Sequence, residues 1–281
     1  MSIGSTINNP FYELYPNLNC SGIVLINDVP VFSFLGKDTK DGILDGSVPI
    51  NHVVLQSGKY NVVGKIFPRF GQKTLTENDG MEISFNVSDI DNWKETKQNF
   101  FPQLSTPDPS FDKNNKITSP LKGLPYFEIT TEIEVELPFV LDGWQNSIDL
   151  NKINKTILKN KVIEFYSQIH AILKEHNASK FLELSKEKED LQTKAFYFNS
   201  IRKQEIRDSI ISLFNKNLEV LPLNPDELKL EIFGYGKLVS LIRTDGSAAL
   251  QFKRENIEGE RNIELEVKLH ARSLEKGLSI I

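Results

Sequence analysis

The chain has 281 residues, of which 39% are hydrophobic and 25% are charged, and its formal net charge is −5. This length accommodates one large domain or two ordinary ones, each with its own core. No apolar run approaches the roughly 18 residues of a membrane helix, and the first residues lack the basic and apolar regions of a signal peptide. The sequence therefore predicts a globular, cytoplasmic protein with no membrane partner.

Cysteine usage and charge distribution narrow the possible partners. The single cysteine, Cys20, excludes an internal disulfide and fits a reducing compartment. Residues 1–148 carry 11 Lys and Arg against 18 Asp and Glu, and residues 149–281 carry 22 against 20. Nucleic-acid binding needs a basic face, which this distribution does not provide. An acidic first half is instead compatible with a basic protein partner.

The first half of the chain is predicted to form β-strands. Residues 22–26 and 29–34 flank Asn27 and Asp28, a pattern that predicts a hairpin. Pro30 has no N–H for a strand ladder, so the second strand of this hairpin is expected at a sheet edge. Further strands are predicted over residues 48–55, 60–67 and 81–87.

The clearest predicted strand covers residues 126–137. Its apolar side chains alternate with Glu128, Thr130, Glu132, Glu134 and Glu136, which is the period of a strand with one buried and one wet face. Such strands are typical of an antiparallel sandwich.

A long segment without strand or helix patterning precedes that strand. Residues 102–124 are rich in Pro, Ser, Asn and Lys, so most of this segment is predicted to be a loop. A loop of this length inside a compact domain is uncommon and is either mobile or functional. Two hypotheses follow, a mobile spacer and a loop that contacts a partner.

The second half begins with helices. Residues 150–176 carry apolar side chains at steps of three and four, with Asp149 as the expected N-cap. Further helices are expected over residues 179–192 and 195–216. Strands are predicted over residues 228–233, 237–243, 248–253, 263–272 and 278–281, with Asp245 and Gly246 in a hairpin turn.

The change of period near Asn146 predicts an α+β protein with two domains. Residues 1–147 are expected to form an antiparallel β-sandwich domain, and residues 148–281 a domain of helices followed by a curved antiparallel sheet, each with its own core. In element order, residues 150–281 resemble the cystatin-like and nuclear-transport-factor-like cone domains. This resemblance implies a sheet that wraps a long N-terminal helix, and it carries over no functional residue.

No pattern in the chain indicates catalysis. The four histidines include no pair at the i, i+4 spacing of a helical zinc site. His270 shares a predicted strand face with Glu264 and Glu266, so a solvated side chain is expected. Cys20 has no CxxC context and is predicted to be a buried, inert thiol. The sequence therefore predicts a protein that is not an enzyme and has no cofactor and no metal site.

The glutamate row, Glu128, Glu132, Glu134 and Glu136, is the most unusual polar feature of the chain. Carboxylates that alternate along one strand face lie about 7 Å apart and repel one another, so a positive group is expected nearby. Three hypotheses are open: Lys and Arg on adjacent strands, a basic partner protein, or a bound cation. The open face of the C-terminal sheet around Tyr235, Arg243 and Arg272 is the alternative partner-binding surface.

These features favour a non-enzymatic protein-binding module. An unexported, acidic chain without motifs resembles the bacterial immunity proteins that neutralise a toxin delivered between cells. One alternative is a structural component of a phage particle or secretion assembly. A second is an enzyme or small-ligand binder that uses the concave C-terminal sheet. The partner's identity and the oligomeric state do not follow from the sequence.

Overall fold

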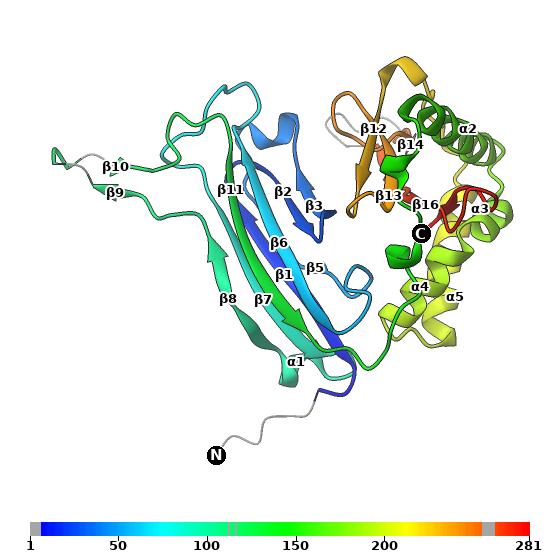
Figure 1. Cartoon of the computed structure of the whole chain (residues 1–281), viewed down its shortest axis with the longest axis horizontal. Helices are drawn as coiled ribbons and strands as arrows, with labels where there is room; N and C mark the ends of the chain where they lie inside the picture. Colours follow the sequence, from blue (N-terminus) through cyan, green and yellow to red (C-terminus); the bar gives the residue numbers. More distant parts are fainter. Residues whose placement is uncertain (1–6, 112, 116, 255–261) are drawn as a thin grey trace. The chain divides into compact units, whose positions relative to one another are not determined.

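The computed structural model describes residues 7–111, 113–115, 117–254 and 262–281. It has an α+β fold built from helices and antiparallel sheets, as the sequence predicts. The chain divides into two compact units, Met1–Val140 and Leu141–Ile281. The N-terminal unit holds the long strands and the C-terminal unit holds the long helices (Figure 1).

The N-terminal unit contains three antiparallel sheets. One has the order β4-β1-β7-β8 with β5 also paired to β1, a second has the order β11-β6-β2-β3, and a third consists of β9 and β10. The strands are β1 (Pro10–Leu18), β2 (Ser21–Ile26), β3 (Val29–Phe34), β4 (Leu44–Asp45), β5 (Val48–Pro49), β6 (Gly58–Phe67), β7 (Met81–Asp89), β8 (Gln98–Ser105), β9 (Ser110–Phe111), β10 (Ile117–Thr118) and β11 (Phe127–Val135). Two short helices, η1 (Lys37–Thr39) and α1 (Trp93–Thr96), connect them.

Local sequence explains the hairpin between β2 and β3. Asn27 and Asp28 have φ values of 45° and 66°, the left-handed conformation that a two-residue hairpin turn requires and that Asn and Asp tolerate. β3 lies at the edge of its sheet, which confirms the prediction from Pro30. β11 lies at the opposite edge and alternates buried and exposed side chains as predicted.

Side chains of the first sheet pack closely against glycines of the second. A Cβ atom at Gly22 would lie 2.4 Å from Leu18 Cδ2 and 2.6 Å from Met81 Cε, and one at Gly64 would lie 2.6 Å from Met81 Sδ. Glycine is therefore required where these two sheets approach each other.

One predicted strand in this unit is wrong, and two strands were not predicted. The strand expected over residues 48–55 stops at Pro49, because Asn51 turns the chain and fixes it by accepting a 2.7 Å bond from the Tyr12 N–H. β1 was not predicted because it contains Pro10 and Pro16. On one side of β1, β5 pairs with Glu13 and Leu14 and β4 pairs with Asn17 and Leu18, so Pro16 lies in the gap between these two short strands. β8 also extends into the expected loop as far as Ser105.

The C-terminal unit begins with short turns and four helices. Asn154 caps the longest helix by accepting bonds from the N–H groups of Thr156 and Ile157, whereas Asp149, the predicted cap, serves a preceding 3-10 turn. The predicted second helix is interrupted at Ser185, where the chain changes from one helix to the next. The helical elements are η2 (Trp144–Asn146), η3 (Leu150–Lys152), α2 (Lys155–Lys174), α3 (Ala178–Leu184), α4 (Lys186–Ala195), α5 (Ser200–Asn215) and η4 (Pro225–Glu227).

The C-terminal strands form two sheets, β12-β13-β16-β17 and β14-β15. The turn predicted at Asp245 and Gly246 is present, but the strands that it joins belong to different sheets and meet only in the bridge between Ile242 and Ala248. The strand predicted over residues 263–272 is likewise split. The strands are β12 (Leu228–Phe233), β13 (Leu238–Arg243), β14 (Leu250–Phe252), β15 (Ile263–Leu265), β16 (Leu269–His270) and β17 (Ser279–Ile280).

One helix and the larger sheet supply the centre of this unit's core. The apolar face of α2, with Leu158, Val162 and Ile169, packs into one cluster with residues of β13 and β16. Tyr166 is fully buried in that cluster, where its hydroxyl donates to the Val267 carbonyl at 2.6 Å and accepts from the Leu241 N–H at 3.1 Å. α2 is therefore fixed to the sheet by packing and by hydrogen bonds.

The unit boundary lies seven residues before the predicted one, between Val140 and Leu141. Residues 141–147, which we call the leading segment, are bonded into the C-terminal unit. Arg272 donates to the carbonyls of Asp142 and Gly143, and Lys237 Nζ donates to the Ser147 carbonyl at 2.6 Å. Independent folding of the two units stays a prediction.

We expect fragments 1–140 and 141–281 each to fold, and fragment 148–281 to be less stable than 141–281. Loss of Ser147 leaves a ring nitrogen of the buried His270 without its 2.7 Å partner, which costs about 1–3 kcal/mol. Urea denaturation followed by circular dichroism measures the difference. A single unfolding transition of the full chain, together with insoluble fragments, would show one cooperative domain instead.

Candidate protein-binding surface

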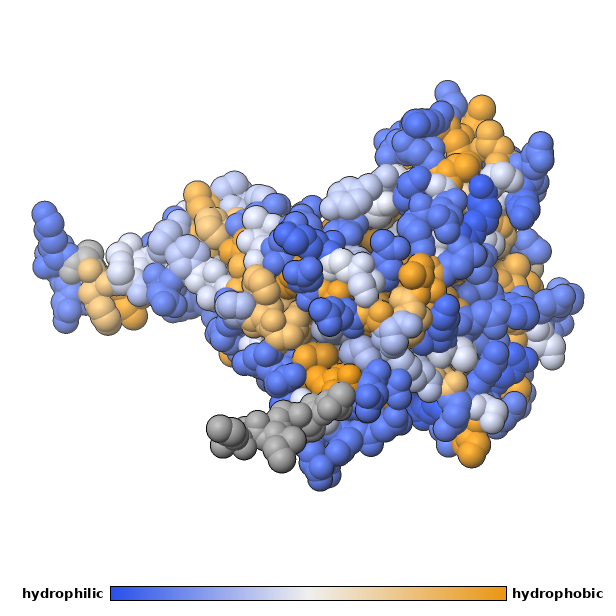
Figure 2. All heavy atoms as spheres, turned by 60° about the horizontal axis from the view of Figure 1, so that its bottom comes forward, coloured by the Kyte–Doolittle hydropathy of each residue, from blue (hydrophilic) through white to orange (hydrophobic). Residues whose placement is uncertain are grey.

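A hairpin of the N-terminal unit extends beyond the strands that flank it. We call residues 107–118 the arm; it contains β9 and β10 and projects past the ends of β8 and β11 (Figure 1). All its described residues are exposed. Phe111 and Ile117 are direct cross-strand partners and are 68% and 50% exposed. Figure 2 shows apolar side chains on this projecting part, at the left edge of the view.

Both ends of the arm are anchored. On one side the Thr106 N–H donates to the Met81 carbonyl at 2.9 Å. On the other side Ser119 is 8% exposed and its hydroxyl accepts from the Leu121 N–H at 3.2 Å, while Leu121 itself is fully buried. The arm therefore leaves the unit from two fixed points rather than from a loose loop.

The arm has little internal stabilisation for its length. Each of its strands contains two residues, and an isolated hairpin of this size is marginal in water. An aromatic and a β-branched side chain nevertheless lie opposite each other in solvent, in a molecule whose other large apolar side chains are mostly buried. An exposed apolar pair on a projecting element is typical of a protein-contact site.

The predicted glutamate row lies on the exposed face of β11. All four carboxylates are exposed, and lysines of β6 lie opposite two of them: Glu128 pairs with Lys65 in the ladder, and Glu134 with Lys59. Lys59 Nζ lies 2.9 Å from Glu132 Oε1, and this hydrogen bond, with the charges of Glu132 and Glu134, raises the pKa of the lysine.

The structure thus places cations on the adjacent strand, the first of the three explanations for the row. Four carboxylates face two lysines, so this face keeps an excess of negative charge. Since β11 is an edge strand, the charges also oppose edge-to-edge pairing with another sheet.

The structure does not bring Tyr235 and Arg243 together. Tyr235 lies in the turn between β12 and β13 and is 62% exposed, whereas Arg243 lies at the other end of β13, opposite Leu228. The Arg243 guanidinium donates to the carbonyls of Pro222 and Ala249, at 2.9 and 3.1 Å. Arg243 therefore holds neighbouring chain segments in place.

Arg272 is part of an internal network. Its guanidinium donates to Glu187 Oε1 at 2.8 Å and to Asp142 Oδ1 at 3.0 Å, in addition to the two carbonyls of the leading segment. Burial raises the pKa of Glu187, but its interactions with Arg272, His270 and Ser279 outweigh burial and hold the pKa below its usual value. Arg272 joins the leading segment to α4.

His270 is buried in the same network, and the prediction of a solvated ring is wrong. Its side chain is inaccessible to solvent, its Nδ1 lies 2.7 Å from Ser147 Oγ, and its Nε2 lies 3.0 Å from Glu187 Oε1. The second contact is close but poorly aligned for a hydrogen bond. The ring is buried because α4 and the leading segment cover the face of β16 that the alternation assigned to solvent.

The order serine, histidine, carboxylate resembles that of a nucleophile, its base and an orienting acid. Ser147 is 4% exposed, and a nucleophilic hydroxyl must contact a substrate, so the network acts in packing. Sequence analysis missed it because Ser147 and Glu187 are distant from His270 in the chain.

Cys20 is buried as predicted, and burial, followed by the charge of Asp79, raises its pKa to about 12.

Comparisons with protein-family models, with curated proteins and with solved structures found no match to this chain. In the part of the chain that the structure describes, no helix has both the length and the apolar character needed to cross a bilayer. Across the same residues, no group of three or more His, Cys, Asp and Glu side chains is arranged to hold a metal ion.

The His270 network predicts a pH-dependent stability. Burial lowers the pKa of His270, although the Glu187 carboxylate partly opposes this shift. Below pH of about 6.5 the unfolded chain binds a proton that the folded chain does not, so the free energy of unfolding falls as the pH is lowered through that value. Urea denaturation between about pH 7 and 5.5 measures the slope.

Replacing His270 by Gln should reduce this slope, because the titrating ring is removed. His170→Gln is the matched control, since the His170 ring contacts the Leu221 carbonyl outside the network. A variant His270→Gln with an unchanged slope would assign the pH dependence to other groups.

Proposed function

We propose that this chain is a non-enzymatic protein-binding module that uses the arm as its principal contact. The observation that carries the proposal is the exposed Phe111–Ile117 pair on a hairpin whose two ends are both anchored. Burying two such side chains contributes about 1.5–3 kcal/mol each. Fixed ends reduce the ordering entropy lost on binding, so more of this energy supports affinity.

The glutamate row supplies the electrostatic part of the contact. It begins on β11, which residues 119–126 connect to the arm, and in this proposal one partner contacts both. The excess of carboxylates over lysines on this face favours a basic partner surface. In this proposal the arm provides affinity, and the row accelerates and orients the encounter.

A toxin with a basic functional surface fits this description, and the chain would then act as an immunity protein. An apolar arm that enters a cleft of the toxin, with carboxylates opposite basic residues at its rim, would block access to the cleft. The support for this form of the proposal is the shape and charge of the N-terminal unit.

The arm also favours a second function, that of a subunit in a larger assembly. Hairpins that extend beyond a subunit's core suit contacts between subunits, and here the partner would include further copies of the chain. Sedimentation velocity over a range of concentrations distinguishes the two functions. Self-association that depends on Phe111 supports the assembly subunit, and a persistent monomer supports the module that binds a different protein.

Replacing Phe111 and Ile117 together by Ser should weaken partner binding by about 30-fold or more, the loss of roughly 2 kcal/mol that marks a binding hot spot. The partner is first identified by a photo-crosslinking side chain at position 111, and its affinity is then measured by calorimetry.

Ile43→Ser is the matched control, since Ile43 is an equally exposed apolar residue of the same unit, at 70%. The stability of the N-terminal unit should not change in either variant, because neither site contacts its core. Equal affinities of the control and the double variant would place the interface away from the arm.

Neutralising Glu134 and Glu136 with Gln should slow association with that partner several-fold and leave dissociation unchanged, because exposed charges act mainly on the encounter. Substitution at these two positions leaves the ion pair between Lys59 and Glu132 intact. Glu82→Gln with Glu95→Gln is the control, as both are exposed on other elements. Stopped-flow association rates at two salt concentrations test this, and a rate equal to wild type at low salt would contradict it.

A further inference from the structure

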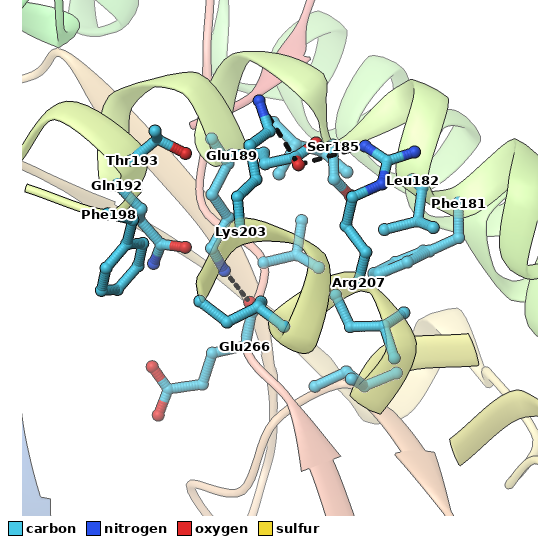
Figure 3. A pocket seen from close by; sticks show the side chains of 16 residues that line it. Phe181, Leu182, Ser185, Glu189, Gln192, Thr193, Phe198, Lys203, Arg207 and Glu266 are labelled. Carbon is cyan, nitrogen blue, oxygen red and sulfur yellow. Dashed lines mark hydrogen bonds and ion pairs between the residues drawn. The ribbon is translucent and has the colours of Figure 1, made fainter. Parts of the chain in front are cut away.

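The C-terminal unit contains a cavity of about 230 Å³ between helices α3, α4 and α5, residues 265–267 and Ile280 of β17 (Figure 3). This is smaller than the roughly 300–1,000 Å³ of pockets for drug-sized ligands, so it suits a small molecule. Its walls are mainly apolar, formed by Phe181, Leu182, Phe198, Ile206, Ile210 and Val267.

Ser185 contributes a buried hydroxyl with an unusual bonding state. The residue is 9% exposed and lines the cavity, and its Oγ has no hydrogen-bond partner in the described structure. Ser185 is the N-cap of α4, where a serine normally accepts a bond from the first turn, yet its side chain makes no capping bond. A buried hydroxyl without a partner is costly, so a ligand group that bonds to Ser185 Oγ would be stabilised there.

Lys188 lies three residues after Ser185, on the same face of the helix. Its ammonium has three donors, and among the described residues it makes one long bond, 3.4 Å to the Glu266 carbonyl. Burial, followed by the charge of Lys268, lowers the pKa of Lys188, while Glu266 opposes the shift. An anion against this nitrogen would offset the cost of burial and favour the charged form of Lys188.

The charges at the rim do not cancel this preference for an anion. Glu189 accepts from Arg207 at 2.8 and 3.1 Å and lies 3.6 Å from Lys203, as the dashed lines in Figure 3 show. Glu266 also lines the cavity, so its lining carries three cations, Lys188, Lys203 and Arg207, against two carboxylates. The N-terminus of α4, a helix of ten residues, contributes further positive potential.

We propose that this cavity binds a small amphipathic monocarboxylate, with its carboxylate accepting bonds from Ser185 Oγ and Lys188 Nζ and its apolar body against the aromatic and aliphatic walls. The carboxylate supplies the partner that Ser185 Oγ lacks and a second acceptor for Lys188 Nζ, in addition to the Glu266 carbonyl. Ser185 and Lys188 both line the cavity and lie three residues apart on one helix face, so one acid group can bond to both. This site is separate from the arm, and the inference does not rest on the proposed protein-binding function.

Calorimetry on the full chain with octanoate as the probe tests the proposal. We expect one site per chain, binding at least tenfold tighter than octanol, which has the same body without the charge. Lys188→Met should weaken octanoate binding tenfold or more and remove the preference over octanol, and Ser185→Ala should weaken it several-fold. Thermal denaturation confirms that each variant is folded.

Lys186→Met is the matched control, because Lys186 lies on the same helix but is exposed and paired with Asp190. It should bind octanoate like the wild type. Absence of octanoate binding at millimolar concentration, equal affinity for octanol, or equal weakening by Lys186→Met and Lys188→Met would overturn the proposal.

Discussion

The bond between Arg272 and Glu187 connects segments of the C-terminal unit that are distant in the chain. Glu187 lies in the first turn of α4, and its carboxylate also contacts His270 of β16 and accepts from Ser279 of β17 at 2.8 Å. Arg272 adds the leading segment through Asp142 and Gly143. A single acid and base thus fix a helix, two strands and the start of the unit. Lys188 and Glu189, which line the cavity, follow Glu187 directly in α4.

The N-terminal unit follows a different constraint, the close approach of two sheets at glycine positions. That packing fixes Met81, and Met81 in turn accepts the main-chain bond that holds one end of the arm. The arm itself contributes nothing to the core. A rigid base that carries an exposed apolar pair is hard to explain by stability alone, because folding gains nothing from those side chains. The N-terminal unit thus separates the residues that maintain its fold from the residues that we assign to binding.

Predictions from sequence succeeded where the relevant interactions are local. The turn at Asn27 and Asp28, the alternation along β11 and the apolar face of α2 depend on conformational preference and spacing within a few residues. Predictions failed where distant segments decide the outcome. β1 tolerates its prolines because of how β4 and β5 pair beside it, and His270 is buried by residues far away in the chain. The arm was expected to be a loop, and the sequence did not show that Phe111 and Ile117 pair across two strands within it.

The central claim is that the N-terminal unit binds a protein partner through the arm. Hydrogen–deuterium exchange of the wild-type full chain tests this most directly, measured with and without the non-covalently bound partner that crosslinking identified. The account predicts that binding slows exchange in residues 107–118 and along β11, while the helices of the C-terminal unit keep their free-state rates. Protection confined to the C-terminal unit, with the arm exchanging as fast as in the free protein, would contradict the account.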